Sequence, residues 1–130
     1  MNTQITKIDR KNYADLGEVL GPYTQSVTYQ NTLYTSGLTA FGSLAQQEGI
    51  EAQTRAIFSQ LSHICQTNNV TLKNLIKVTL FVSDFSEMES LRATLFDLYG
   101  KHIPASSLVK VDALFSEDLK IEIEAIIALA

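Results

Sequence analysis

Cysteine, histidine and positive charge are all scarce in this sequence of 130 residues. The single cysteine, Cys65, cannot form an intrachain disulfide, and no second thiol stands near the two histidines at a spacing that metal ligands use. We therefore expect a reducing, cytoplasmic compartment and no structural metal.

Lysine and arginine together number 10 against 14 acidic residues, so the net charge is −4 and the chain has no global positive field. Long apolar runs are also missing. The longest uncharged apolar stretch, residues 125–130, is far shorter than the roughly 20 residues that span a bilayer, and residues 1–10 lack the apolar core of a signal peptide. We expect neither nucleic acid nor a membrane as partner, and no export signal.

The remaining composition is that of an ordinary globular domain, with 45% apolar and 18% charged residues, six glycines and two prolines. The length suits one domain with its own core, and the sequence has no repeat or long linker. We predict a single domain over residues 1–130.

Alternation of apolar and polar residues predicts about six strands. Gln30 and Asn31 suit the tight turn of a hairpin between the second and third strands. In the fourth strand the apolar residues Ile76, Val78, Leu80 and Val82 are predicted to share one face. The predicted strands cover residues 5–9, 26–30, 32–39, 75–82, 107–113 and 119–129.

Two segments instead have the period of a helix. The first starts near Gly49 and ends at Asn68-Asn69, with an apolar stripe of Ile50, Ile57, Leu61 and Ile64. The second is predicted to begin at Asp84 or Ser86 with Glu89 completing a capping box, and to stop at Gly100. Its apolar stripe consists of Met88, Leu91, Leu95 and Leu98.

This order of elements predicts an α+β fold, in which both helices pack on one face of one sheet. The opposite face would carry Phe81 and apolar residues of the hairpin beside polar ones. Water alone covers such a face poorly, so we predict a partner subunit there.

Six short segments, in order and at matching spacings, resemble the RidA/YjgF family of reactive-intermediate deaminases from about Gly21 to Ile127. They are 21–26 (GPYTQS), 34–37 (YTSG), 52–55 (AQTR), 77–84 (KVTLFVSD), 104–107 (PASS) and 121–126 (IEIEAI).

The resemblance implies a chorismate-mutase-like fold with a mixed sheet, assembled as a homotrimer. It also implies three small-molecule clefts at the subunit boundaries and no cofactor. Well-studied members of the family hydrolyse reactive enamines and imines to 2-oxo acids and ammonia.

The family has an arginine after Pro-Ala at the start of the penultimate strand, where it holds the substrate carboxylate. Here Ser106 follows Pro104-Ala105. One neutral hydrogen bond in place of two charge-assisted ones is expected to weaken carboxylate binding by roughly 1.5 to 3 kcal/mol. Deaminase activity is therefore expected to be altered or lost.

Other site residues are implied by the resemblance, and each has a plain structural alternative. Glu122 would activate the hydrolytic water or else be an exposed strand carboxylate, and Tyr23 would close over the ligand or else only pack. Ser36 and Gly37 would offer a backbone amide to an anion or else form a simple β-bulge. Phe81 and Ser107 would line the site or else be ordinary strand residues.

Arg92 is a second departure, because the family usually has asparagine at this place. Helical spacing from Met88 and Leu95 predicts that Arg92 lies at the edge of the buried stripe. We hypothesise that it supplies the guanidinium that Ser106 does not. The alternative is an edge arginine whose stem covers apolar surface while its head is solvated.

Three functions remain open from the sequence. The first is hydrolysis of a small enamine or imine, and the second is a non-catalytic protein that binds a small metabolite, such as a carboxylate, in the same cleft. The third, an endoribonuclease or translation inhibitor, is disfavoured by the acidic charge and the absence of a basic and aromatic stripe.

Overall fold

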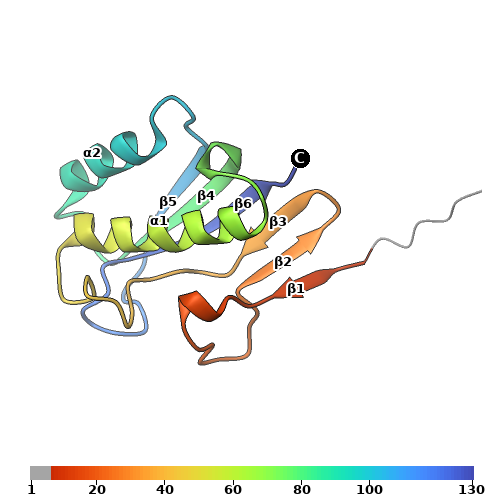
Figure 1. Cartoon of the computed structure of the whole chain (residues 1–130). Coiled ribbons are helices and arrows are strands. Elements are labelled where there is room, and N and C mark those ends of the chain that lie inside the picture. The colour runs from red at the N-terminus through yellow and green to blue at the C-terminus, as the bar shows by residue number, and fades with distance from the viewer. Residues whose placement is uncertain (1–6) are drawn as a thin grey trace, which may run out of the picture.

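The computed structural model describes residues 7–130, which form one six-stranded sheet and two helices (Figure 1). The strand order is β1-β2-β3-β6-β4-β5, and every neighbouring pair is antiparallel except β4 and β5, which are parallel. The sheet is therefore mixed, as predicted. The elements are β1 (Asp9–Lys11), β2 (Ser26–Tyr29), β3 (Thr32–Thr35), α1 (Ile50–Thr67), β4 (Leu75–Val82), α2 (Met88–Tyr99), β5 (Ala105–Lys110) and β6 (Ile121–Ala128), with short 3-10 turns η1 (Ala14–Leu16) and η2 (Leu72–Asn74).

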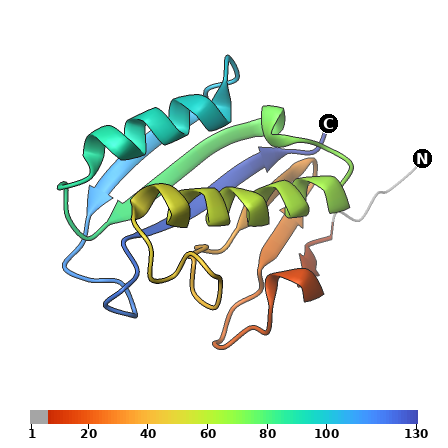
Figure 2. The ribbon, with the colours of Figure 1, turned by 60° about the vertical axis from the view of Figure 1, so that its left-hand side comes forward.

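Both helices lie on the same face of the sheet, which confirms the predicted α+β architecture (Figure 2). The core between them and the sheet is apolar: the predicted stripe of α1 is buried, and so are alternate residues of β4 and β6. Asn68 caps α1, and Asn69 takes a left-handed φ of 64° that turns the chain. Neither helix in the described part of the chain has the length and apolarity needed to cross a bilayer.

One side chain of β4 points the opposite way from the prediction. Val78 and Val82 are buried, but Ile76 is 45% exposed and Leu75 is buried in its place. The register between β4 and β6 shifts between Leu75 and Lys77, so a β-bulge reverses the alternation at the start of the strand.

The start of α2 also differs from the predicted capping box. Asp84 accepts hydrogen bonds from the amide and hydroxyl of Ser86, and α2 begins only at Met88 without a side-chain cap. Glu87 instead accepts a 3.3 Å hydrogen bond from the amide of Ile50 at the start of α1. A carboxylate there favours α1, because the N-terminus of a helix carries partial positive charge.

Several strand boundaries are corrected by the structure. The third predicted strand, residues 32–39, ends at Thr35 as β3, because its ladder with β6 is interrupted after Tyr34. The first predicted strand, residues 5–9, lies partly outside the described residues, and β1 covers Asp9–Lys11. The penultimate strand ends at Lys110 and not at residue 113, because Lys110 pairs with Val82, the last residue of its partner β4. The last strand is Ile121–Ala128 in place of residues 119–129.

The face of the sheet away from the helices is partly apolar. Tyr34, Phe81, Val109 and Ile126 occupy register positions on it beside polar Lys77. All six residues of the edge strand β5 are exposed as well. The uncovered face that the sequence predicted is therefore present in the single chain.

Candidate functional site

The ladder between β3 and β6 is interrupted where the site residues converge. Tyr34 pairs with Ile126, whereas the next pairing along the chain joins Leu38 to Ile123, so one extra residue is inserted on the β3 side. The hydroxyl of Thr35 accepts a 3.0 Å hydrogen bond from the amide of Ala125 and fills part of the gap. The predicted alternative of a β-bulge at Ser36-Gly37 is therefore real, and it directs Gly37 toward β6.

Gly37 lies directly against the carboxyl group of Glu122. A Cβ at position 37 would lie 2.7 Å from Cδ of Glu122 and still closer to its Oε2. A side chain at position 37 would overlap the carboxylate, so the Glu122 side chain would have to move away. The Gly37 amide has no hydrogen-bond partner among residues 7–130, so a free N–H lies beside a carboxylate.

Glu122 occupies a half-buried position on the open face of β6, in register with Phe81 of β4. Burial raises the pKa of its carboxyl group above the ordinary value, and the neighbouring negative charge of Glu124 adds to the rise. A carboxyl group with a raised pKa exchanges protons more readily near neutral pH than an exposed one does. Glu122 is thus chemically suited to proton transfer.

A cleft of about 280 Å³ opens on the other side of the Gly37 backbone. Tyr23, Ser36 and Gly37 line it, together with leucines of the N-terminal loop and two phenylalanines. The Tyr23 amide donates a 2.9 Å hydrogen bond to the carbonyl of Gly21, which fixes the loop at Pro22, while the Tyr23 side chain is 48% exposed. Glu122 is not among the residues that line this cleft.

Both hydrogen-bond donors of Ser36 are used within the protein. Its hydroxyl donates a 2.6 Å hydrogen bond to the carbonyl of Thr24, and its amide donates a 3.0 Å hydrogen bond to the carbonyl of Gln25. The backbone amides of Ser36 and Gly37 were the candidates for anion binding, and within residues 7–130 only the Gly37 amide is free to donate to a ligand.

Sequence reasoning missed the polar network that anchors the Tyr23 loop. The buried side chain of Gln25 accepts a 2.7 Å hydrogen bond from the backbone amide of Tyr13, and the backbone amide of Gln25 donates a 2.8 Å hydrogen bond to the side chain of Asn12. The Tyr13 hydroxyl in turn contacts Ser26 at 2.7 Å and Asn68 at 3.0 Å. The only sequence signal was the position of Gln25-Ser26 within the family-like segment.

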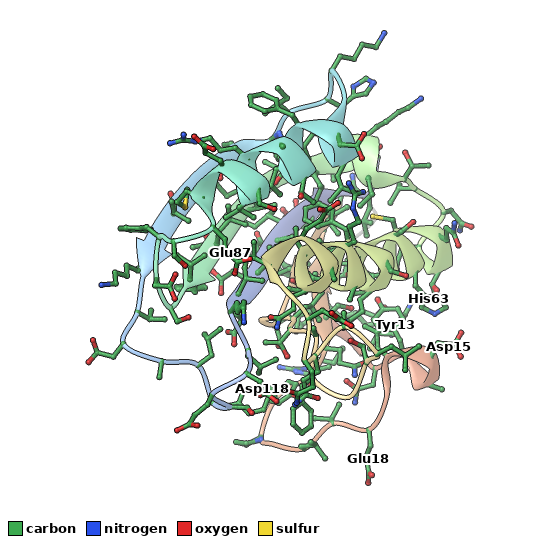
Figure 3. The ribbon with its side chains drawn as sticks, turned by 90° about the vertical axis from the view of Figure 1, so that its left-hand side faces the viewer. Tyr13, Asp15, Glu18, His63, Glu87 and Asp118 are labelled. Carbon is green, nitrogen blue, oxygen red and sulfur yellow. The ribbon has the colours of Figure 1, made fainter. Side chains whose placement is uncertain are left out.

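Gln53 is a second residue that the sequence did not indicate. It forms hydrogen bonds to two loops, one that holds Gln46 and Glu48 and one that holds Asp118. Its side chain is fully buried, donates to the carbonyls of Gln46, Glu48 and Asp118 at 2.8 to 3.2 Å, and accepts a 2.8 Å hydrogen bond from the Lys120 amide. Both loops lie below α1, where Figure 3 labels Asp118.

The carboxylate of Asp118 adds further links between the same two loops. It accepts hydrogen bonds from the side chains of Gln46, Gln47 and Ser116. The bond from Ser116 is the main cause that lowers the pKa of Asp118.

The remaining predicted site residues lie apart from this cluster. Ser106 and Ser107 are exposed on β5, where they pair with Val78 and Thr79 and are separated from β6 by the whole of β4. Phe81 alone among the β4 and β5 candidates lies next to Glu122.

Arg92 is exposed on α2, contrary to the expectation of a half-buried edge position. The buried face of α2 is centred on Leu91 and Thr94, and Arg92 lies roughly a third of a turn from it. Because α2 covers the helix-bearing face and Glu122 lies on the opposite face, one chain does not bring the two side chains together (Figure 2).

The thiol and the imidazole near α1 do not form a second centre. Burial raises the pKa of the Cys65 thiol to about 11, which keeps it protonated and unreactive at neutral pH. His63 lies 3.4 Å from the exposed carboxylate of Asp15 and packs edge-on against Tyr13. Figure 3 shows these three labelled side chains gathered between α1 and η1. Within residues 7–130 no three potential metal ligands cluster.

Comparison with known proteins gives a consistent result. The family described as Endoribonuclease L-PSP matches residues 15–129. A 2-iminobutanoate/2-iminopropanoate deaminase of Salmonella typhimurium is 32% identical over 114 residues, which cover 82% of this chain and 87% of that protein. The crystal structure of the E. coli YjgF gene product is similar with a TM-score of 0.75 and 31% identity, covering 85% of this chain and 90% of that one. RidA from the Antarctic bacterium Psychrobacter has a TM-score of 0.77 at 26% identity, covering 97% and 99% of the two chains.

Proposed function

Because the chain belongs to the Endoribonuclease L-PSP family, which includes the RidA and YjgF proteins, we propose that it hydrolyses small 2-imino acids to 2-oxo acids and ammonia. The observation that carries the proposal is the half-buried carboxyl group of Glu122 beside the free amide of Gly37. The proposal also draws on the relatives at about 30% identity whose names specify this reaction.

The chemistry needs no redox partner and no cofactor. Water adds to the carbon of the protonated imine while the Glu122 carboxylate accepts one of its protons, which gives a carbon that bears both a hydroxyl and an amino group. Glu122 then returns that proton to the amino nitrogen, the carbon–nitrogen bond breaks and ammonia leaves, and the hydroxyl group releases its proton to solvent as the carbonyl forms. The Gly37 amide and the Tyr23 hydroxyl are the hydrogen-bond donors assigned to the substrate.

The functional unit in this proposal is a homotrimer with its clefts at the subunit boundaries. Support comes from the partly apolar open face of the sheet and from the fully exposed strand β5. In such an assembly Ser106 and Ser107 of one subunit reach the cleft of its neighbour. The single buried thiol of Cys65 fits a reducing, cytoplasmic setting.

The first test compares imine decay with and without the protein. An L-amino-acid oxidase generates 2-iminobutanoate in place, and released ammonia is followed over the rate in buffer. Glu122→Gln is expected to reduce kcat by about 10²- to 10⁴-fold, since the amide cannot accept the proton. The matched control is Glu124→Gln, the exposed carboxylate two residues along the same face of β6. Equal rates for Glu122→Gln and the parent would remove Glu122 from the mechanism.

The carboxylate anchor is tested by two further variants. Ser106→Arg is expected to lower KM about ten- to a hundredfold by supplying a bidentate guanidinium. Arg92→Ala loses affinity for carboxylates only if the exposed Arg92 of a neighbouring subunit acts as the anchor. An unchanged KM in Arg92→Ala removes that hypothesis and leaves Ser106 with the backbone amides as the anchor.

A non-catalytic binding protein is the second candidate, because among residues 7–130 no guanidinium lines the cleft and position 106 is serine. It predicts that the parent binds 2-oxo acids but does not accelerate imine decay, and that Ser106→Arg gains activity. The ribonuclease activity in the family description is disfavoured by the net charge of −4. Failure to bind single-stranded RNA at low salt would exclude it.

A further inference from the structure

The carboxyl group of Glu122 has no hydrogen bond of its own that would hold it in place. Within residues 7–130 only burial and the charge of Glu124 shift its pKa, and no hydrogen-bond donor contributes. The place of the carboxyl group against Gly37 therefore depends on the backbone of β6. Because a displacement of about 1 Å can cost roughly a hundredfold in rate, the contacts that fix β6 near Glu122 bear on the reaction.

On the C-terminal side of Glu122, β6 is fixed by a backbone bridge. Ile123 and Leu38 exchange two hydrogen bonds of 2.8 and 3.0 Å between their backbone amides and carbonyls. Leu38 follows Gly37 directly, so the same bridge also holds Gly37 beside the carboxyl group. This side of the site is fixed by the main chain alone.

On the N-terminal side of Glu122, a side chain holds the backbone instead. The regular pairing of β6 with β4 starts only at Ile121, opposite Val82. Before that point the backbone amide of Lys120 donates a 2.8 Å hydrogen bond to the side-chain oxygen of Gln53. Gln53 thus holds the residue two positions before Glu122.

Gln53 is itself held rigidly near the start of α1. Its side chain is fully buried, and its nitrogen donates to the carbonyls of Gln46 and Asp118 at 3.0 and 2.8 Å. The loops that carry these two carbonyls also meet through Phe41 and Phe115, whose ring centroids lie 5.1 Å apart. Because both the oxygen and the nitrogen of the Gln53 amide are used, the side chain has one orientation.

From these contacts we infer that Gln53 is a positioning residue for the proposed reaction: it fixes the place of Glu122 through the backbone of Lys120. The inference rests on the proposed function, because it concerns the same carboxyl group. Loss of the Gln53 amide is expected to lower kcat about ten- to a hundredfold. KM should change little, because the Gly37 amide and Tyr23 are held by other contacts.

The kinetic test compares Gln53→Met with Asn74→Leu. Methionine fills a similar space without an amide group. Asn74 is the matched control, because its side-chain amide also binds the backbone of β6, donating a 2.8 Å hydrogen bond to the carbonyl of Ala128 at the far end of the strand. Both variants are expected to lose stability in urea, but only Gln53→Met should lose kcat, measured per folded protein on 2-iminobutanoate generated in place.

The second readout is the titration of the Glu122 carboxyl group, followed by carbon NMR. In Gln53→Met more water reaches this group, so its pKa should fall toward the ordinary value of 4.5. The acid limb of the pH profile of kcat/KM should move in the same direction. If Gln53→Met does not fold, Gln53→Asn keeps the amide on a shorter stem and should show part of the same changes.

The outcomes separate the inference from the function on which it rests. If folded Gln53 variants keep the parent kcat and the parent titration of Glu122, the inference is overturned while imine hydrolysis stands. Equal changes in Asn74→Leu would overturn it as well, because they would reflect the general stability of β6. If the parent hydrolyses no imine, the proposed function fails, and the titration of Glu122 in the two variants alone decides whether Gln53 positions it.

Discussion

Gly37 and Glu122 lie beside a network of buried hydrogen bonds, whereas Ser106 and Ser107 lie on an edge strand whose residues are all exposed. In the first region a change of side chain disturbs contacts on which the fold depends. In the second region a change meets mostly solvent in the single chain, so the fold tolerates it. Ser106 thus lies where the single chain makes few structural demands on a side chain.

Gly37→Ala should have the largest effect and tests the first region most directly. The added methyl group overlaps the Glu122 carboxyl group, so either the bulge or that side chain has to move. Overpacking of this kind costs about 1 to 3 kcal/mol, and imine hydrolysis should fall with it. Urea unfolding measures the loss of stability.

The double variant Gly37→Ala with Glu122→Ala tests whether overlap with the Glu122 carboxyl group causes the loss of stability in Gly37→Ala. Removing the carboxyl group frees the space, so the double variant should be more stable than the sum of the two single effects predicts. Additive effects would show that the overlap is not what destabilises Gly37→Ala.

The variants Gln25→Leu and Ser107→Ala compare how much each region contributes to the free energy of unfolding. Loss of the Gln25 side chain leaves the buried Tyr13 amide without its partner, at a cost of about 1 to 3 kcal/mol. The exposed Ser107→Ala change should stay within about 0.5 kcal/mol of the parent. Chemical denaturation of both variants makes the comparison, and similar losses would contradict the proposed difference between the regions.

Tyr99→Phe serves as a comparison for both regions, because Tyr99 lies at the end of α2 and outside them. The Tyr99 hydroxyl is buried without a partner, and burial raises its pKa to about 12. Removing the hydroxyl should increase stability by up to about 1 kcal/mol without changing activity. Thr54→Val removes the other buried hydroxyl that lacks a partner and should act in the same direction. A lower melting temperature in both variants would contradict this account.

The smallest expected effect is the pH dependence that Glu122 gives to stability. Its pKa is higher in the folded than in the unfolded chain, so its contribution is most favourable below the ordinary value of 4.5 and is lost as pH rises through the folded pKa. Glu122→Gln should therefore gain stability over the parent at pH 7 but not at pH 4, by less than about 1 kcal/mol because the side chain is half-solvated. Thermal unfolding at the two pH values measures the difference, and a gain that is larger at pH 4 would reverse the sign.

Local periodicity predicted the elements well. The bounds of β4 and the buried stripe of α1 agree with the structure, because both depend on spacings within one element. The orientation of Ile76 and the start of α2 were wrong, since a register shift against β6 and a turn closed by Asp84 decided them. The position of Arg92 was predicted only from its spacing to Met88 and Leu95. In the folded chain α2 packs with another face toward the core, so Arg92 is exposed to solvent.

The candidate site was only partly predictable for the same reason. Family-like segments indicated Tyr23, Gly37 and Glu122, but no sequence spacing indicated that the last two touch. Gln25 and Gln53 gave no signal of their own, because a buried glutamine is identified only by the distant backbone groups that it binds.

The sequence by itself determined the two helices, the six strands and the acidic, cysteine-poor character of the chain, because these follow from composition and from periods of two or 3.6 residues. Only the tertiary structure decided which residues meet. The bulge that brings Gly37 to Glu122 and the paired loops that bring Phe41 to Phe115 depend on strand register and loop closure between distant segments. Such contacts form only when the core has fixed the strands, so no local pattern encodes them.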